Sequence, residues 1–210
     1  MTTTLRSRGA PASAYTRWAK PAFDRLVAAT LLLVLAPLFA LVAIGVRLTM
    51  GRGVIFRQSR VGRHGEDFTI LKFRTMHHDR RRRVLAIDFV DRRLTHKSAH
   101  DPRHTRFGRF LRASSIDELP QLVNVLRGEM SLVGPRPEVS EVADAHGFRF
   151  HPRHDVLPGI TGPWQISPLR CELLCENLDL DVEYVNEVSF RTDVDILART
   201  VQDVVARAGA

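Results

Sequence analysis

The stretch LVAATLLLVLAPLFALVAIGV, residues 26–46, carries no charge and dominates the first quarter of this 210-residue chain. As an α-helix, its 21 residues would be about 32 Å long, close to the roughly 30 Å thickness of a bilayer's hydrocarbon core. A cleavable signal peptide has a shorter apolar region of about 7–15 residues, followed by small residues at the cleavage site, whereas Arg47 follows this run. The stretch therefore predicts a helix that remains in the membrane.

Basic residues flank this apolar run on both sides. They are Arg6, Arg8, Arg17, Lys20 and Arg25 before it, and Arg47, Arg52, Arg57, Arg60 and Arg63 after it. Because basic residues prefer the cytoplasmic side of a membrane, this pattern favours a re-entrant helix that enters and returns on the same side. Pro37, near the middle, would bend such a helix. A spanning helix with a proline kink is the alternative, since membrane helices tolerate proline.

The composition is that of a folded protein with an anionic partner. Hydrophobic residues make up 44% and charged residues 26%, which excludes a disordered chain. The 31 Lys and Arg residues outnumber the 23 Asp and Glu residues, giving a net charge of +8. This balance indicates a phospholipid surface, a nucleic acid or a phosphorylated small molecule as partner. The presence of only two cysteines, Cys171 and Cys175, argues against a disulfide framework.

The remaining segments predict an α+β fold that is mainly helical. Residues 54–76 contain two β-rich runs separated by the turn sequence GRHGED, which is typical of a β-hairpin. Apolar residues at helical spacing predict a short helix over 118–127, ended by Gly128, and a C-terminal amphipathic helix. The C-terminal pattern consists of Val194, Leu197, Val201 and Val204.

Two segments are expected from this pattern, and part of the second is irregular. Residues 1–50 hold the membrane helix, at about 26–47, and residues 51–210 form a cytoplasmic domain. Within that domain, residues 77–106 are rich in Arg and His and predict an exposed basic excursion. In a chain with a membrane anchor, the RRRR run in this excursion favours anionic lipid over nucleic acid.

The stretch RASSIDELPQL, residues 112–122, places two acids, Asp117 and Glu118, side by side in a basic chain. One explanation is structural, because Ser115 and Glu118 have the spacing of a helix capping box. A helix capped by Ser115, however, would put Pro120 at its fifth position, where the ring clashes with the preceding turn. Proline is tolerated in the first turn, so it favours a helix that begins at Asp117.

Capping and ordinary surface charge explain most Asp-Glu pairs, but a chemical explanation is also compatible with that position. Helix N-termini attract phosphate, and neighbouring side chains on a helix diverge by about 100°. One acid can then share Mg²⁺ with substrate phosphates, while the other attacks phosphorus, since carboxylates form covalent phosphoryl intermediates. The basic residues available to neutralise the phosphates are Lys72, Arg74, Arg112 and Arg136.

Several motifs in a fixed order resemble the bacterial sugar transferase family, the monotopic polyprenyl-phosphate phosphoglycosyl transferases. After the membrane run these are FRQSRVGRHGEDFTILKFRTM, DPRHTRFGRFLRASSIDELPQLVNVLRGEMSLVGPRPE, LPGITGPWQI and LDLDVEYVNEVSF. The resemblance covers about residues 18–200, and the combination of DELPQL with GPRP is its most specific part. The chain is similar to the minimal form of the family.

The resemblance implies the transfer of a sugar 1-phosphate from a nucleotide diphosphate sugar, commonly UDP-linked, to a polyprenyl phosphate. Asp117 would be the nucleophile that forms a phosphosugar intermediate, and Glu118 would bind Mg²⁺. The family fold has a re-entrant helix and amphipathic helices on the cytoplasmic face of the bacterial cell membrane, in contact with phospholipids. Such an enzyme would begin the assembly of a surface glycan or glycoconjugate, and no nucleic acid partner is expected.

The resemblance also suggests further site residues and shows departures from the family pattern. Lys72, Arg112 and Arg136 match basic positions near the phosphates, and Asp181 matches an acid of the site region. The alternatives for Lys72 and Asp181 are an exposed strand charge and a local cap. The departures are Ala36 before Pro37, Pro163 in the tryptophan loop, and SPL at 167–169 where a Ser-Gly-Arg sequence is common.

Two other functions remain open from the sequence. The net charge and the RRRR run are also compatible with a membrane-tethered basic module that binds an anionic polymer or lipid without catalysis. A metal-dependent hydrolase of nucleotide sugars would use water in place of the polyprenyl acceptor. The sequence does not choose the sugar, the nucleotide, the prenyl length or the glycan pathway.

Overall fold

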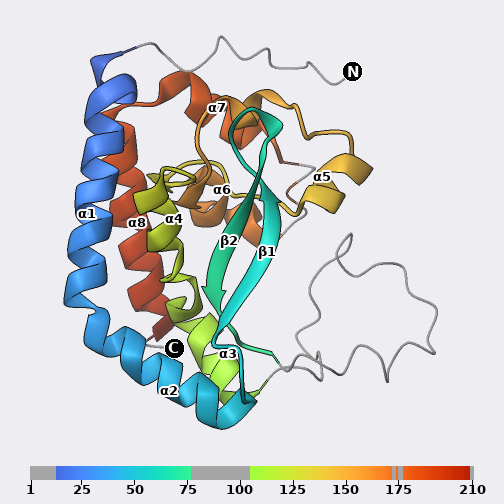
Figure 1. Ribbon diagram of the computed structural model, residues 1–210. Helices are drawn as coiled ribbons and strands as arrows, with labels where there is room; N and C mark the ends of the chain where they lie inside the picture. The colour runs from blue at the N-terminus through green and yellow to red at the C-terminus, as the bar shows by residue number, and fades with distance from the viewer. Residues whose placement is uncertain (1–12, 77–104, 172–173, 175–176, 209–210) are drawn as a thin grey trace.

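A computed structural model describes residues 13–76, 105–171, 174 and 177–208 (Figure 1). The fold is α+β and mainly helical, as the sequence predicts. Its helices of at least six residues and its strands are α1 (Lys20–Val34), α2 (Ala36–Met50), β1 (Ile55–Val61), β2 (Asp67–Phe73), α3 (Arg106–Ala113), α4 (Gln121–Arg127), β3 (Ser131–Val133), α5 (Ser140–Ala145), β4 (Gly159–Thr161), α7 (Asp179–Glu187) and α8 (Phe190–Ala208).

The apolar run at 26–46 forms the end of α1 and most of α2, with a break at Leu35. Pro37 lies in the first turn of α2, and in a continuous helix its ring would clash with the carbonyl group of Leu33. Within the described residues, no one helix has both the length and the apolar character to cross a membrane. The segments Tyr15–Val34 and Ala36–Met50, bent by 64°, meet that criterion only together.

One face of α1 and α2 packs against the rest of the protein, and the opposite face is apolar and exposed. Ala28 of α1 lies in a core cluster with residues of β2, α4 and β3, and Val46 of α2 lies in another with Phe73 and Leu111. On the outer face the most exposed are Leu33, with 79% of its surface accessible, and Leu48, with 80%. This face leaves a long apolar surface without a partner in the described part of the chain.

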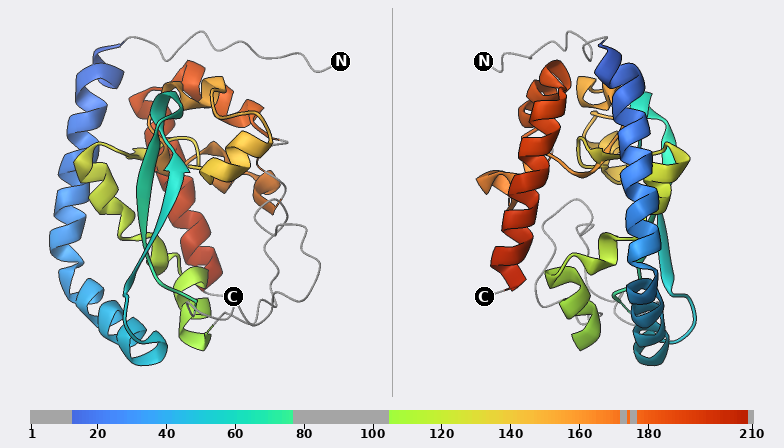
Figure 2. Two further views of the ribbon diagram at one scale, coloured as in Figure 1. Left: turned by 45° about the vertical axis from the view of Figure 1, so that its right-hand side comes forward. Right: turned by 90° about the vertical axis from the view of Figure 1, so that its left-hand side faces the viewer.

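The predicted β-hairpin is confirmed. Strands β1 and β2 are antiparallel, and Phe56 faces Lys72 while Arg60 faces Phe68. Because side chains alternate along a strand, these four residues lie on one face of the hairpin. Figure 2 shows the hairpin as a long twisted ribbon that passes in front of α8. Its face brings cations from both strands toward the same region of the protein.

The two loops noted in the sequence, SLVGPRPE and LPGITGPWQI, are joined by a small parallel sheet. Ser131 of β3 pairs with Gly159 of β4, and Val133 pairs with Thr161. The backbones come so close that a Cβ atom on Gly134 would lie 2.4 Å from the carbonyl oxygen of Leu157. Glycine is therefore required where the loops meet, and the contact holds both loops beside β2.

The helix after the acid pair ends as predicted but begins later. Gly128, with a φ angle of 77°, terminates α4 in the left-handed conformation. The prediction that this helix begins at Asp117 is wrong. Residues Ile116–Glu118 form a separate 3-10 turn, and Pro120 is the N-cap of α4. The N–H groups of Glu118 and Leu119 donate to the carbonyl groups of Ser115 and Ile116, three residues earlier, and these bonds form the 3-10 turn that precedes α4.

Two further predictions concern the C-terminal helix and the basic excursion. The C-terminal amphipathic helix is confirmed as α8. Of the predicted excursion at 77–106, residues 77–104 lie outside the described residues, and Arg106 already belongs to helix α3. The side chain of Thr105 caps α3 by accepting a hydrogen bond of 2.8 Å from the N–H group of Gly108.

Candidate active site

The acid pair lies in a tight connection between α3 and α4. Ser115, just before it, adopts a left-handed conformation with φ of 57°, which is uncommon for a residue other than glycine. Its side chain makes no capping hydrogen bond, so the capping-box explanation of the acid pair is wrong. Ile116 packs into the core cluster of α2, and Asp117 and Glu118 follow it directly. The connection thus anchors the acid pair through Ile116 and places Glu118 within reach of β2.

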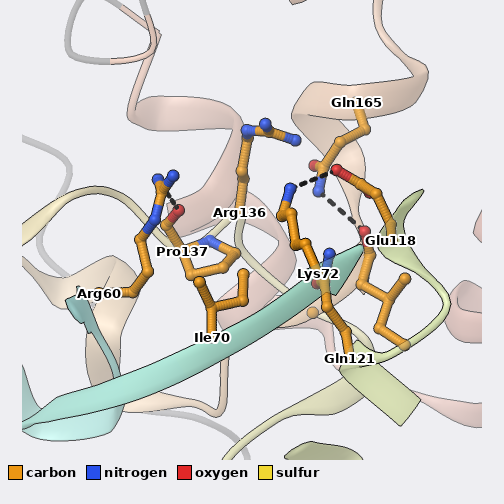
Figure 3. Close-up of a pocket in the computed structure, with 10 residues that line it drawn as sticks. Arg60, Ile70, Lys72, Glu118, Gln121, Arg136, Pro137 and Gln165 are labelled. Atoms are coloured by element: carbon orange, nitrogen blue, oxygen red, sulfur yellow. Dashed lines mark hydrogen bonds and ion pairs between the residues drawn. The ribbon is translucent and has the colours of Figure 1, made fainter. Parts of the chain in front are cut away.

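Lys72, from the end of β2, forms an ion pair with the second acid, Glu118. Its ammonium group lies 2.6 Å from Oε1 of Glu118 (Figure 3). Burial lowers the pKa of Lys72, and the negative charge of Glu118 opposes that shift. Lys72 is therefore a half-buried partner of the acid pair, and the alternative of an exposed strand charge is wrong.

A small cavity of about 10 Å³ lies against this ion pair and is called the dyad pocket below. Its polar lining residues are Arg60, Lys72, Glu118, Gln121, Arg136 and Gln165 (Figure 3). They come from the hairpin, from the start of α4 and from the two loops joined by β3 and β4. Lys72 and Arg136 thus converge beside Glu118, an arrangement suited to binding phosphate groups. The guanidinium group of Arg60 is instead held by the carbonyl oxygen of Pro137, at 3.1 Å, and by the carboxylate of Glu138, at 3.4 Å.

Asp117 lies next to this pocket, in a mixed electrostatic environment. Burial raises the pKa of Asp117 to about 6, and the charge of Glu118 adds to the increase. The positive charges of Lys72 and Arg112 act in the opposite direction. Asp117 is therefore close enough to both cations to be influenced by them.

Arg136, of the GPRP sequence, is held in the pocket by two contacts. Its guanidinium carbon lies 5.6 Å from the ring centre of Trp164, a cation–π arrangement. Its backbone carbonyl oxygen accepts a hydrogen bond of 2.7 Å from Arg153. Arg153 is itself fully buried and paired with Asp181 at 2.6 Å. This pair fixes the loop that carries Arg136.

The structure thus gives Asp181 and Arg74 places outside the dyad pocket. Asp181 reaches the site only through Arg153, and its carboxylate is completely buried. Arg74, suggested as a cation for the phosphates, instead donates hydrogen bonds to the carbonyl groups of Met50, Gly51 and Arg52. Those carbonyl groups lie at and just after the C-terminus of α2, so Arg74 stabilises the end of that helix.

A larger cavity, of about 400 Å³, lies between α1, α4 and β3. Its lining residues differ from those of the dyad pocket. Two of its charged groups, Lys20 and Asp24, lie 3.7 Å apart, and Asp24 also accepts a hydrogen bond of 2.6 Å from Ser131. The acid pair and the converging cations make the dyad pocket the candidate active site.

The bacterial sugar transferase family matches residues 15–207, nearly the whole chain and every element around the dyad pocket. The chain belongs to this family.

Three relatives illustrate the match. The chain is 43% identical to an undecaprenyl-phosphate glucose phosphotransferase of Komagataeibacter xylinus, over 91% of this chain but only 37% of that protein. It is 39% identical to a UDP-glucose:undecaprenyl-phosphate glucose-1-phosphate transferase of Caulobacter vibrioides, over 91% of this chain and 71% of the relative. It is 37% identical to the exopolysaccharide production protein ExoY of Rhizobium meliloti, over 91% of this chain and 88% of the relative.

The acid pair of this sugar transferase has the ligand chemistry to hold a Mg²⁺ ion together with phosphate groups. Within the described ranges, no three His, Cys, Asp or Glu side chains gather to hold a metal ion. Mg²⁺, however, is commonly held by one or two carboxylates together with substrate phosphates and water. Asp117 and Glu118 supply that number of carboxylates, next to cations that suit the phosphates.

Four residues of this site were not found from the sequence. Arg60 and Lys72 occupy the same face of the hairpin, so the strand register contains a signal for Arg60. Gln121 belongs to the DELPQL motif and Gln165 to the tryptophan loop, but neither amide has a pattern that separates it from a surface residue. The fourth residue is Arg153. Its contact with Asp181 joins residues 28 positions apart, and no local sequence pattern reveals such a contact.

Proposed function

We propose that this protein transfers a sugar 1-phosphate from a UDP-sugar to a polyprenyl phosphate. A carboxylate oxygen of Asp117 attacks the β-phosphorus of the donor, the bond to the α-phosphate oxygen breaks, and UMP leaves. The phosphate oxygen of the polyprenyl acceptor then attacks the same phosphorus and releases Asp117. The product is a polyprenyl diphosphate sugar, the starting point of a surface glycan such as an exopolysaccharide.

The observation that carries this proposal is the acid pair beside converging cations. A free carboxylate attacks a diphosphate only if the negative charge of the substrate is neutralised. Lys72 and Arg136 provide positive charge in the pocket, next to Glu118. When bound, Mg²⁺ would be held by Glu118 and would withdraw charge from the diphosphate. The relatives' names support the same donor and acceptor classes, with UDP-glucose as the first sugar to test.

One assay separates this reaction from its alternatives. Detergent-solubilised protein is mixed with Mg²⁺, undecaprenyl phosphate and each member of a panel of UDP-sugars, and UMP and the lipid product are measured. UMP release that requires the lipid supports the proposed transfer. Release of sugar phosphate without lipid supports a hydrolase. No turnover with any donor, while the protein still binds anionic vesicles, supports the membrane-tethered binding module.

We further propose that the bent pair of segments, Tyr15–Val34 and Ala36–Met50, enters the cytoplasmic leaflet of the bacterial cell membrane and returns to the same side. The proposal rests on the exposed apolar face of α1 and α2 and on their 64° bend. The basic residues at both ends of the pair favour the cytoplasmic side. Phospholipids would cover the apolar face, and the dyad pocket would lie at the membrane surface.

Cysteine labelling tests this topology. In a chain with Cys171→Ser and Cys175→Ser, single cysteines are introduced as Ser13→Cys or Arg52→Cys, one at each end of the bent pair. An impermeant maleimide is expected to label both in inside-out vesicles and neither in intact cells. Labelling of either position from outside the intact cell would show a spanning helix. Permeabilised cells provide the control for reactivity of each cysteine.

A further inference from the structure

The side chain of Gln165 is an unusual member of the dyad pocket. Its oxygen Oε1 is buried and has no hydrogen-bond partner among the described residues. Its amide nitrogen lies 3.5 Å from the carbonyl oxygen of Ile160, at the outer limit of a hydrogen bond. A buried acceptor without a donor is unfavourable, so the structure leaves a group here that a ligand or a water molecule would satisfy.

A second amide, that of Gln121, lines the same pocket. Gln121 has only 2% of its surface exposed. Both glutamines lie beside the Lys72–Glu118 ion pair (Figure 3). The cavity of about 10 Å³ has room for one water-sized group. Two amides and the cations of Lys72 and Arg136 therefore surround a space for a single ligand atom.

The amides and the cations require different ligand atoms. A phosphate oxygen accepts hydrogen bonds and suits Lys72 and Arg136, but it has no proton to give to Oε1 of Gln165. That oxygen requires an O–H or N–H group. In a nucleotide diphosphate sugar, the donor group nearest to the β-phosphorus is the substituent on C2 of the sugar, next to the anomeric carbon. The hydroxyl groups of the nucleoside lie farther away, beyond the α-phosphate.

We propose that Gln165, with Gln121 beside it, forms a subsite that binds the C2 substituent of the donor sugar. Oε1 of Gln165 accepts a hydrogen bond from the C2 hydroxyl or from the N–H of a C2 acetamido group. The contact orients the sugar while the cations hold its phosphate. This inference rests on the proposed function, because it requires a sugar diphosphate in the dyad pocket. A water molecule that fills the cavity permanently is the competing explanation.

A cycle of enzyme and substrate changes tests the subsite. The donor is UDP-glucose, or whichever UDP-sugar of the panel turns over fastest, and it is compared with its 2-deoxy analogue. For the unmodified protein, removal of the C2 group is expected to lower kcat/KM by roughly 10- to 100-fold, since Oε1 of Gln165 then stays unpaired. In Gln165→Met, kcat/KM for the natural donor is expected to fall by a similar factor. For the same variant, replacing the natural donor by its 2-deoxy analogue is expected to lower kcat/KM little further.

Three controls make the result specific. Gln165→Glu keeps an acceptor oxygen, so it is expected to retain the preference for the natural donor over its 2-deoxy analogue even if total activity falls. The 6-deoxy analogue is changed at the far side of the sugar. Its kcat/KM relative to that of the natural donor is expected to be the same in the unmodified protein and in Gln165→Met. Gln202 is exposed on α8. Gln202→Met is expected to leave kcat/KM for both the 2-deoxy and the 6-deoxy analogue, each relative to the natural donor, unchanged. Thermal unfolding verifies that each variant is folded.

The outcomes distinguish the subsite from the proposed function. If the penalty for the 2-deoxy donor is the same in Gln165→Met as in the unmodified protein, the subsite is overturned and the cavity holds water. If the unmodified protein transfers sugar phosphate but does not discriminate against the 2-deoxy donor, the subsite also fails while the proposed function stands. If no UDP-sugar is turned over at all, the proposed function fails and the subsite with it.

Discussion

Asp117→Asn is expected to abolish turnover, with a loss of kcat of at least about 10⁴-fold, the scale seen when a catalytic group is removed from an intact site. An amide has the shape of the carboxylate but lacks its negative charge, so it does not attack phosphorus. The steady-state measurement is UMP release in the presence of undecaprenyl phosphate. Asp117 lies within a turn, and its replacement by asparagine preserves the size of the side chain.

The same variant tests the covalent intermediate directly. Without the lipid acceptor, the unmodified protein is expected to retain label from a UDP-sugar that carries ³²P in its β-phosphate, and Asp117→Asn is not. The matched control is Asp195→Asn, which removes a carboxylate from an exposed ion pair with Arg199 on α8 and is expected to leave both readouts unchanged. Normal turnover or labelling in Asp117→Asn would refute Asp117 as the nucleophile.

Asp181→Asn is expected to lower both stability and activity. The carboxylate is fully buried against Arg153, and its loss leaves a buried cation without a counter-charge. Breaking such a pair costs about 3–5 kcal/mol. Arg153 also holds the carbonyl group of Arg136, so the GPRP loop is expected to move and kcat/KM to fall. Chemical denaturation and the UMP assay measure the two effects.

A double variant separates these two roles of the pair. In Arg153→Met/Asp181→Leu both charges are gone, and stability is expected to recover much of what Asp181→Asn loses, because apolar replacement of a buried ion pair is often neutral. Activity is expected to remain low, since the hydrogen bond to Arg136 is still missing. Recovery of full activity together with stability would show that the pair has no part in positioning Arg136.

Elements with a clear local pattern could be predicted from the sequence. The β-hairpin has two β-rich runs and a turn sequence, and α8 has a regular apolar face. The interruption of the apolar run near Pro37 follows from the chemistry of proline. In each case the physical cause acts within a few residues, so the pattern is complete in the sequence itself.

Other features depend on distant contacts or on a local competition between structures. Helix α3 was not expected, because Arg-Phe-Gly-Arg-Phe-Leu-Arg is short and polar, and short helices are stabilised mainly by packing. Here Phe107 and Leu111 pack against α2. The start of α4 was misplaced because a 3-10 turn competes with the α-helix just before Pro120. Asp181 was assigned to the site region without its partner, Arg153.

The position of Ile116 gives the acid pair a mechanical connection to the N-terminal helices. Ile116 packs in the apolar cluster of α2, and Asp117 is the next residue in the chain. Asp117, the proposed nucleophile, is therefore only one peptide unit away from a side chain that packs against the cluster of the proposed membrane segment. The depth at which α2 lies in a bilayer would set the height of Asp117 above the lipid phosphates. The depth of α2 in the cytoplasmic leaflet would then be a variable of catalysis, since it would determine whether a lipid-borne phosphate and this carboxylate meet at the same level.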